Sequence, residues 1–271
     1  MDKKIISLLP KGIEDLNYKI VIGKKKYVLK IFSLNRTFLQ IKSYLNALVI
    51  FKKAGIPVPS LLETAKSSCV MEFFQGKDFE EIKPSRKDIL AIVLNLTKIH
   101  SLEFKIAPNY DSWGTANLLG EYKLKRKYLT KKDLNLIDPI INQFQKINLA
   151  SFPRCIIHGD LNKTNILKNK RGQYCLLDLG CLDFNARIVD VAIFLAQFCL
   201  DLKLNLEKNR EIINLATGHY QKFHKLEKKE LHSLPILIKA TYAAYIIQSS
   251  YLKINKWLSL DRRLLKKLKD L

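Results

Sequence analysis

The chain has 271 residues, of which 48% are hydrophobic and 10% aromatic, and it contains 10 glycines and 8 prolines. This length and composition suffice to bury the core of one large domain or two lobes, and they exclude collagen-like, proline-rich and disordered proteins. The net charge is +22, from 47 Lys and Arg against 25 Asp and Glu. Because the basic residues are scattered along the chain, we expect a solvated basic surface and no specific nucleic-acid partner.

The cysteines and the apolar segments indicate where the protein works. Five cysteines, at positions 69, 155, 175, 181 and 199, form no C-x-x-C pair, and several lie in apolar runs. Such cysteines behave as small hydrophobic residues, which argues against zinc and favours a reducing, cytoplasmic location. The N-terminal stretch MDKKIISLLPKG does not read as a signal peptide. The apolar segment at 191–200 is too short to span a bilayer, so we expect no membrane span.

The first part of the chain carries the pattern of a small α+β lobe. Residues 18–33 form two runs rich in Val, Ile, Tyr and Phe around the sequence GKKK, which predicts a β-hairpin. Apolar residues at helical spacing predict a helix over 35–55, with Gly55 as its C-terminal stop. A further strand is expected over 67–76. These elements together predict an N-terminal lobe over residues 1–75.

The rest of the chain, 76–271, is predicted to be mainly helical. Ser85 is a suitable N-cap for the first of its helices, and Pro139 is expected near a helix boundary. We expect helices over 85–102 and 131–147, short strands at CIIH and QYCLLDL, and almost continuous helix from residue 187 onward.

Three polar residues in the stretch HGDLNKTNILKNKRGQYCLLDLG, at 158–180, have the spacing of a phosphoryl-transfer site. Asp160 and Asn165 form the D-x-x-x-x-N pattern of a kinase catalytic loop, and Asp178 follows a predicted strand and precedes Leu-Gly. In that arrangement the first Asp accepts the proton of the substrate hydroxyl. Mg²⁺ binds a few protein oxygens together with phosphate oxygens and water. The spacing therefore predicts Asp160 as the catalytic residue and Asn165 and Asp178 as metal ligands.

Lys30, in the sequence YVLKIF, matches the strand lysine that contacts nucleotide phosphates in kinases. The preceding turn, PKGIEDLNY at 10–18, would cover those phosphates. It has a single glycine and is therefore not a G-x-G-x-x-G loop. The backbone of Gly12 and the side chain of Asp15 or Asn17 are expected to cap the nucleotide instead.

Each of these features has an ordinary explanation when taken alone. A His-Gly-Asp sequence is often a turn, a strand lysine such as Lys30 is usually solvated, and Asp178 could cap a turn or a helix. Their order along the chain favours the kinase interpretation: a strand lysine, a helix, a hinge strand, the D-x-x-x-x-N loop, and a strand followed by Asp-x-Gly.

The motifs HGDLNKTN, LLDLG and VDVAIFL, together with AGIPVP, VMEFFQG and LTKIHSL, resemble those of the aminoglycoside phosphotransferase and choline kinase superfamily of small-molecule kinases. The resemblance spans about residues 8–200. It implies an α+β, bilobal, protein-kinase-like fold. Residues 1–75 would form a small β-sheet lobe that carries one main helix and binds the nucleotide. Residues 76–271 would form the larger, mainly helical lobe with the catalytic and substrate-binding residues.

The resemblance also implies the cofactors and the roles of individual residues. The cofactors would be ATP, with GTP as an alternative, and Mg²⁺. His158 would brace the catalytic loop, and Asp190 would have a structural role. The implied site consists of Asp160 as base, Asn165 and Asp178 on the metal, Lys30 on the phosphates, and the hinge residues Met71, Glu72 and Phe73 holding the nucleotide base through backbone groups.

One departure from the kinase pattern concerns the partner of Lys30. Kinases pair the strand lysine with a Glu on the following helix, whereas residues 35–55 contain no acidic residue. The region offers Tyr44, Asn46 or Gln40 instead. Lys30 would then be held by phosphate alone or by a carboxylate from elsewhere, such as Glu63. The missing Glu also leaves open a nucleotide-binding pseudokinase or regulatory protein.

The acceptor is the least determined part of the interpretation. Residues 201–271 contain seven acids against fifteen Lys and Arg, which argues against a polycationic aminoglycoside as acceptor. An ammonium group would favour aromatic walls, for which the C-terminal part offers Tyr242, Tyr245, Tyr251 and Trp257.

The phrases KGIEDLNYKIVI, YVLKIF, GIPVPSLL and DVAIFLAQFC resemble the homoserine kinase branch. We therefore expect a small hydroxylated metabolite, either an amino alcohol or a homoserine-like acceptor. An aminoglycoside phosphotransferase remains an alternative, and the absence of an A-P-E motif argues against a protein kinase.

Overall fold

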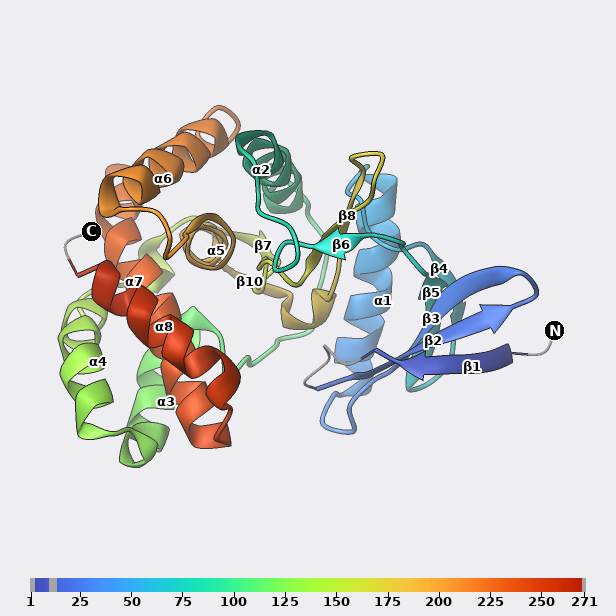
Figure 1. The fold of residues 1–271 in the computed structure, drawn as a ribbon, viewed down its shortest axis with the longest axis horizontal. Helices are drawn as coiled ribbons and strands as arrows, with labels where there is room; N and C mark the ends of the chain where they lie inside the picture. The colour runs from blue at the N-terminus through green and yellow to red at the C-terminus, as the bar shows by residue number, and fades with distance from the viewer. Residues whose placement is uncertain (1–2, 10–13, 270–271) are drawn as a thin grey trace. The chain divides into compact units, whose positions relative to one another are not determined.

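The computed structural model describes residues 3–9 and 14–269, which form two compact units (Figure 1). Unit 1 contains the described residues up to 83 together with 104–109 and 163–182, and unit 2 contains the remainder. This division differs from the predicted boundary between residues 75 and 76, because unit 1 also takes in the segment 163–182 with Asn165 and Asp178. The N-terminal unit is therefore built from three separate stretches of the chain.

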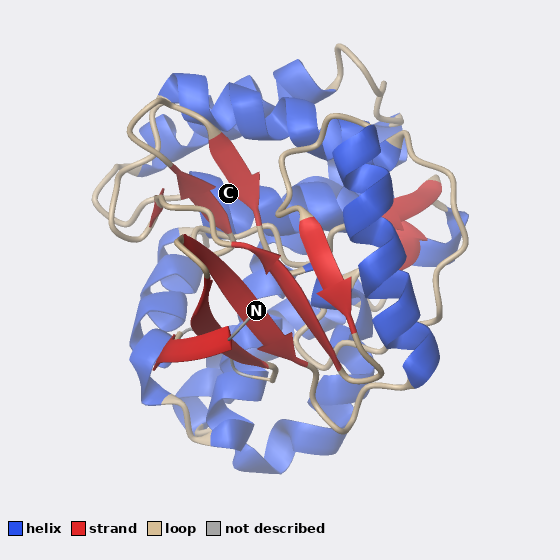
Figure 2. Ribbon diagram, turned by 90° about the vertical axis from the view of Figure 1, so that its right-hand side faces the viewer, coloured by secondary structure: helices blue, strands red, loops and turns tan. Residues whose placement is uncertain are grey.

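Unit 1 is built on an antiparallel five-stranded sheet, whose strands are among those drawn in red in Figure 2. The predicted hairpin is confirmed: its two strands pair from Leu16 with Ile31 to Ile22 with Lys25, and Gly23 adopts the left-handed φ of +61° that the turn requires. The edge strands were not predicted from the sequence. The order is β1 (Lys3–Leu8), β2 (Leu16–Ile22), β3 (Lys25–Ile31), β5 (Ser68–Glu72) and β4 (Leu61–Thr64).

The predicted helix of unit 1 is confirmed as α1 (Phe38–Lys53). It begins at Thr37, whose hydroxyl accepts from the backbone N–H of Gln40 while the Gln40 side chain accepts from the backbone N–H of Thr37. It ends before Gly55, which has a φ of +70°. The buried face of the helix follows the expected spacing: Ile41, Tyr44, Ala47, Leu48 and Phe51.

A second, three-stranded sheet in unit 1 carries two of the predicted site residues. Its order is β6 (Lys77–Asp78), β8 (Ile166–Lys168) and β9 (Tyr174–Leu176), and it is followed by the short 3₁₀ helix η4 (Leu179–Cys181). The backbone N–H of Leu176 donates to the Pro57 carbonyl at 2.6 Å, which ties β9 to the segment that follows α1. Asn165 directly precedes β8, and Asp178 lies between β9 and η4.

Unit 2 is mainly helical, which confirms the predicted fold class. Its first helix is α2 (Arg86–His100), which begins with a capping box between Ser85 and Asp88. One short antiparallel pair joins β7 (Arg154–Ile157) to β10 (Asp183–Ala186). The other helices are α3 (Leu118–Lys125), α4 (Lys131–Phe144), α5 (Arg187–Phe194), α6 (Leu206–Tyr220), α7 (Lys228–Leu252) and α8 (Asn255–Lys267), with short 3₁₀ segments at Thr115–Asn117, Arg126–Tyr128 and Leu149–Ser151 and a π-helical turn at Leu195–Cys199.

Pro139 lies inside α4 rather than near its boundary, unlike the expectation from the sequence. The helix tolerates it because Pro139 is on the exposed side, where water can satisfy the carbonyl that loses its intrahelical partner. Among the helices that the structure describes, none combines the length and the apolar character needed to cross a bilayer.

A buried carboxyl group on α8 is expected to make the stability of the protein depend on pH. Asp261 is 3% exposed, and its Oδ2 atom has no hydrogen-bond partner. Burial raises the pKa of Asp261 from 3.8 to about 7. Because the pKa of Asp261 is higher in the folded protein than in the unfolded chain, the folded protein binds this proton more tightly. The resulting contribution to the free energy of unfolding is complete below about pH 3.8 and is lost as the pH rises to about 7.

We therefore expect Asp261→Asn to stabilise the protein in a pH-dependent way. The gain in unfolding free energy relative to the wild type should grow between pH 4 and pH 7 and then level off, reaching on the order of 4 kcal/mol. Urea denaturation at a series of pH values measures it. A difference between variant and wild type that stays constant from pH 4 to pH 8 would contradict the assignment.

Candidate active site

Lys30 is buried in the sheet of unit 1 and is held by two carboxylates. Its Nζ atom lies 2.8 Å from Asp15 Oδ2 and 3.6 Å from Asp178 Oδ1, and its side chain is 3% exposed. The ring of Tyr44, on the buried face of α1, lies 5.2 Å from the same nitrogen. Asp15 thus takes the place of the missing helix Glu, while Glu63 is exposed on β4. Asp15, which the sequence offered as one possible cap of the nucleotide, is buried, and both of its carboxylate oxygens already have partners.

The charged groups of this cluster stabilise one another's ionised forms. Burial alone would lower the pKa of Lys30, but Tyr44, Asp178 and Asp15 together raise it above its ordinary value. Burial alone would raise the pKa of Asp15, but Lys30, the hydrogen bond from Arg36 and that from the Ser33 backbone together lower it. Both groups are therefore ionised at neutral pH, and the site keeps a fixed positive charge beside Asp178.

Asn165 and Asp178 lie close together across the β8–β9 hairpin. The backbone N–H of Leu177 donates to the Asn165 carbonyl at 2.8 Å, so the residues that flank β8 and β9 are adjacent. Asp178 has a left-handed φ of +56°, which is rare outside glycine, and its side chain is 43% exposed. Strained backbone of this kind persists where neighbouring structure fixes it.

The donor set at this hairpin fits Mg²⁺. A carboxylate and a side-chain amide oxygen are hard ligands, and Mg²⁺ completes its shell with phosphate oxygens and water. In the part of the chain that the structure describes, no three His, Cys, Asp or Glu residues are grouped so that they could hold a metal by themselves. Asn165 and Asp178 would therefore hold the ion jointly with the nucleotide.

The loop that carries Asp160 in unit 2 is anchored by Asp190. The backbone N–H of His158 donates to Asp190 Oδ2 at 2.7 Å, and that of Gly159 donates to Oδ1 at 2.9 Å. Gly159 has a φ of +82°, which turns two successive N–H groups toward one carboxylate. His100 Nε2 lies 3.0 Å from Asp190 Oδ2 and completes the anchor. The predicted structural roles of His158 and Asp190 agree with these contacts.

The Asp190 carboxylate at the centre of this anchor is fully buried and stays ionised. Asp190 and His158 are both 0% exposed. Burial alone would raise the pKa of Asp190, but the hydrogen bond and charge of His100 and the contacts with His158 together lower it. The other ring nitrogen of His100 lies 2.7 Å from the Tyr220 hydroxyl, which fixes the orientation of the imidazole. The catalytic loop therefore rests on a charged, rigid support.

The carboxylate of Asp160 is oriented by two donors on one of its oxygens. Asn162 Nδ2 donates to Oδ1 at 2.7 Å, and the Tyr245 hydroxyl donates to the same atom at 2.9 Å. The ring of Trp113 packs edge to face on Tyr245, with the centroids 5.5 Å apart. Trp113 had not been identified from the sequence, because a single Trp in an irregular segment gives no periodic signal.

The other aromatic residues considered for an acceptor wall have different surroundings. Tyr242 is 0% exposed and its hydroxyl donates to the Ala196 carbonyl, so it belongs to the core. Tyr251 packs against the ring of Tyr128. The Trp257 ring lies 5.0 Å from Lys256 Nζ. Of the four residues named from the sequence, Tyr245 is the one that contacts Asp160.

Two of the predicted hinge residues, Met71 and Glu72, lie on β5, in the same sheet as Lys30. In the pairing of β3 with β5, Lys30 lies opposite Cys69, and Met71 and Glu72 lie opposite Val28 and Tyr27. Glu72 is therefore about 10 Å along the strand from the lysine, a span that an extended ligand can bridge. Phe73 follows directly and its ring lies 4.7 Å from Lys19 Nζ. Gly12, the remaining predicted nucleotide contact, lies outside the described residues.

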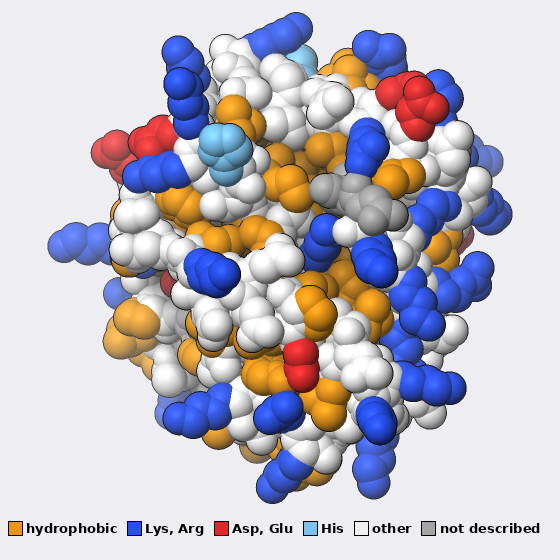
Figure 3. Space-filling view, turned by 90° about the vertical axis from the view of Figure 1, so that its left-hand side faces the viewer, with side chains coloured by type: hydrophobic (Ala, Val, Ile, Leu, Met, Phe, Trp, Pro, Cys, Tyr) orange, Lys and Arg blue, Asp and Glu red, His pale blue; other side chains and the backbone are white. Residues whose placement is uncertain are grey.

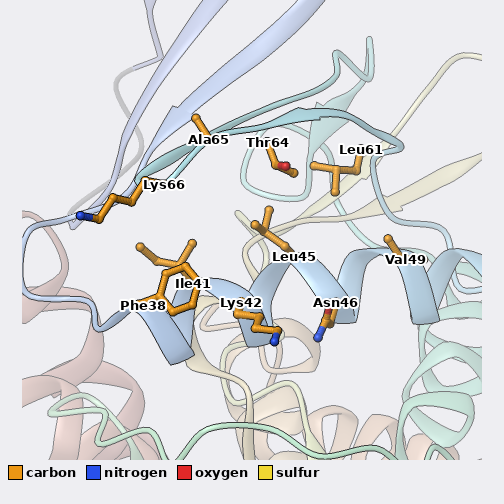
Figure 4. A pocket seen from close by; sticks show the side chains of 10 residues that line it. All are labelled: Phe38, Ile41, Lys42, Leu45, Asn46, Val49, Leu61, Thr64, Ala65 and Lys66. Carbon is orange, nitrogen blue, oxygen red and sulfur yellow. The ribbon is translucent and has the colours of Figure 1, made fainter.

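A groove of about 530 Å³ lies on the other side of α1 (Figure 4). Leu45 and Val49 point from the helix toward Leu61 and Thr64 of β4, as Figure 4 shows. The groove is lined by Asn46, which the sequence offered as a possible partner of Lys30, but by none of the predicted catalytic, metal or nucleotide residues that the structure describes.

Comparisons with known proteins bear on the family and on the fold. A model of the Phosphotransferase enzyme family matches residues 5–222. A homoserine kinase of Polaromonas naphthalenivorans (strain CJ2) is 27% identical over 249 residues, which are 84% of this chain and 76% of that protein. An amicoumacin kinase in complex with AMP-PNP, Ca²⁺ and Ami has a TM-score of 0.72 at 14% identity, over 99% of this chain and 88% of that one. Plasmodium vivax ethanolamine kinase has a TM-score of 0.68 at 13% identity, over 99% of this chain and 82% of that one. The structural likenesses confirm the predicted protein-kinase-like fold.

Proposed function

Because the chain belongs to the phosphotransferase enzyme family, which confirms the predicted enzyme class, we propose that it transfers the γ-phosphoryl group of ATP, with Mg²⁺, to the hydroxyl group of a homoserine-like amino acid or amino alcohol. The observation that carries this proposal is the buried cluster in which Lys30 is paired with Asp15 and lies 3.6 Å from Asp178. The missing helix Glu was the reason to consider a pseudokinase, and Asp15 supplies the carboxylate that the helix lacks.

The residues of unit 1 would bind and orient the nucleotide. Lys30 would contact its phosphates, Asn165 and Asp178 would hold Mg²⁺, and the backbone of Met71, Glu72 and Phe73 would contact the rest of the nucleotide. The metal ion supplies neutralisation of the charge on the phosphate oxygens. Phosphoryl transfer requires little covalent chemistry from the protein, so positioning and charge account for most of the catalysis.

Asp160 would act on the acceptor as the catalytic base. The acceptor oxygen forms a bond to the γ-phosphorus as the bond from that phosphorus to the β–γ bridging oxygen breaks, and ADP leaves. The proton of the acceptor hydroxyl passes to the Asp160 carboxylate. The Tyr245 and Asn162 donors to Oδ1 fix the plane of that carboxylate, which orients its proton-accepting lone pairs.

The preference for a small acceptor rests on sequence likeness and on charge. The 27%-identical relative is a homoserine kinase. A polycationic aminoglycoside would need several available carboxylates, whereas Glu211, Glu227 and Glu230 in the C-terminal helices form ion pairs with Lys208, Lys229 and Arg187. A single ammonium group could instead lie against the Trp113 and Tyr245 rings.

One face of the molecule shows how the high positive charge is distributed. On the face drawn in Figure 3, Lys and Arg side chains are dispersed among uncharged, hydrophobic and a few acidic ones. A nucleic-acid site would require them to gather along one track. On the face drawn, the Lys and Arg side chains do not form one such track, and the expected absence of a specific nucleic-acid partner stays a prediction.

A phosphate-transfer screen tests the proposed function. Purified protein would be incubated with ATP and Mg²⁺ against homoserine, amino alcohols, aminoglycosides and sugars, and ADP release and phosphorylated product would be quantified. We expect acceptor-dependent product with an amino acid or amino alcohol. Product formation only with aminoglycosides would replace the proposed acceptor class, and ATP binding without transfer to any acceptor would favour the pseudokinase.

Removing the Tyr245 hydroxyl is expected to impair turnover without unfolding the protein. Tyr245→Phe loses one hydrogen bond to a charged group, so we expect the turnover number to fall about tenfold, which corresponds to about 1.4 kcal/mol. Steady-state kinetics with the acceptor from the screen measures this. Tyr251→Phe, on the same helix, is the matched control. Equal turnover for the two variants would argue that Tyr245 has no role at Asp160.

A further inference from the structure

We propose that Arg36 is the positioning residue of the nucleotide and metal site. It would fix the turn that follows Asp178 relative to the carboxylate of Asp15, which pairs with Lys30. This inference rests on the proposed function and extends it to a residue that no kinase motif in the sequence identified. Arg36 lies immediately before Thr37, the N-cap of α1, and its side chain is 13% exposed.

The guanidinium group of Arg36 joins two parts of unit 1. Its Nε donates to Asp15 Oδ1 at 3.0 Å, and its Nη1 donates to the Gly180 carbonyl at 3.0 Å. Asp15 uses its other oxygen, Oδ2, for Lys30. One side chain therefore connects the lysine's carboxylate partner with the backbone two residues beyond Asp178.

The Gly180 carbonyl accepts a second hydrogen bond, from Asn109 Nδ2 at 2.9 Å. The side-chain oxygen of Asn109 accepts a hydrogen bond from Gln40 Nε2 at 3.2 Å. Two residues near the start of α1 therefore contact the Gly180 carbonyl, Arg36 directly and Gln40 through Asn109. A Cβ atom at position 180 would lie 2.5 Å from Arg36 Nη2 and 3.0 Å from Asp178 Oδ1. Glycine at this position is what allows the guanidinium to approach the turn so closely.

The left-handed backbone of Asp178 needs such a support. A φ of +56° is uncommon outside glycine, although aspartate adopts it more readily than most residues, and neighbouring structure holds the backbone in that conformation. Arg36 and Asn109 fix the carbonyl that follows, while Lys30 faces the carboxylate itself. In a kinase, the helix Glu fixes the strand lysine relative to the rest of the site. Here the residue that precedes the helix would do so, through Asp15 and Gly180.

The shape of the side chain matters as much as its charge. Arginine presents several N–H donors in a planar fork, whereas lysine presents a single ammonium group at the end of a flexible stem. Lysine at position 36 could keep the positive charge but could not reach Asp15 and Gly180 together. The structure therefore separates a purely electrostatic role, which Arg36→Lys preserves, from a geometric one, which it removes.

The test compares Arg36→Lys and Arg36→Gln with the control variant Arg171→Lys. Arg171 is an exposed arginine of unit 1, between β8 and β9, so Arg171→Lys makes the same chemical change without altering the hydrogen bonds to Asp15 or Gly180. For both Arg36 variants we expect the KM for Mg-ATP, and the dissociation constant of Mg-ATP measured by calorimetry, to rise about 10- to 100-fold, as for other residues that orient metal ligands. The acceptor KM should stay near the wild-type value, and Arg171→Lys should match the wild type throughout.

A merely structural role for Arg36 would give a different result. Loss of folded protein lowers the active fraction and the melting temperature, but it leaves KM and the dissociation constant of Mg-ATP unchanged. Wild-type affinity in a folded Arg36→Lys variant would overturn the inference. Failure of the wild-type protein to bind Mg-ATP would instead overturn the proposed function, which keeps the two outcomes distinct.

Gly180→Ala provides a second variant that leaves Arg36 in place. The added methyl group must displace the guanidinium, so we expect it to reproduce the weaker Mg-ATP binding of Arg36→Gln. In the double variant the two losses should not add, because the second substitution disturbs a contact that is already lost. Full additivity, or unchanged affinity in Gly180→Ala, would contradict the proposal even if the Arg36 variants failed to fold.

Discussion

Asp160→Asn is expected to lower the turnover number for phosphoryl transfer by about 10²- to 10⁴-fold, the range that a general base contributes. Asparagine retains an oxygen that can accept from Tyr245 and Asn162, so the loop should keep its shape. What is lost is the ability to accept the acceptor proton. The melting temperature and the dissociation constant of Mg-ATP should therefore remain close to those of the wild type.

The control for this substitution is Asp183→Asn, at the beginning of β10. Asp183 is an aspartate in the same unit whose Oδ2 accepts from Asn185 on its own strand. Its replacement should leave turnover unchanged. Turnover of Asp160→Asn within about threefold of the wild type would show that Asp160 does not act as the base, since a removed base costs at least about 10²-fold.

Asp190→Ala is expected to have the largest effect on stability. The substitution leaves the N–H groups of His158 and Gly159, and the imidazole of His100, buried without their acceptor. Removing one partner from a buried charged network costs about 3–5 kcal/mol, a large fraction of the total stability of a domain. Urea denaturation at neutral pH measures this loss, and Asp190→Asn, which keeps one acceptor oxygen, should lose less.

The pH dependence of this contribution has a definite sign. The folded-state pKa of Asp190 is lowered below 3.8, so the stability that it contributes is present above that value and is lost as pH falls through the folded-state pKa. The difference between wild type and Asp190→Ala should therefore be constant around neutral pH and shrink in acid. A loss below about 1 kcal/mol at neutral pH, the size of an ordinary hydrogen bond, would contradict the anchoring role.

Local signals in the sequence were sufficient for much of the fold. The hairpin around Gly23, the N-cap at Ser85 and the glycine stop at Gly55 each depend on a few neighbouring residues, and all appear in the structure. The short strand β8 was not predicted from the sequence. Pro139 was misjudged because its cost depends on which side of the helix faces water.

The polar partnerships of the site were harder to predict because they join distant residues. Asp15 and Lys30 are close because the Gly23 turn places Asn17 opposite Lys30, which leaves Asp15 diagonal to the lysine. That register could have been derived from the hairpin. Arg36 and Gly180 are 144 residues apart and carry no shared motif. Such contacts follow only from the packed fold.

The most direct test of the central claim is a ³¹P NMR measurement of the complete reaction. The wild-type protein would be mixed with ATP, Mg²⁺ and homoserine, and phosphate-containing species would be followed over time. We expect a phosphomonoester signal to grow in step with ADP, only when the acceptor is present, and to be absent on the same time scale with Asp160→Asn. If no phosphomonoester of any screened acceptor formed, or if Asp160→Asn formed it at the wild-type rate, the assignment of this site to phosphoryl transfer through Asp160 would be contradicted.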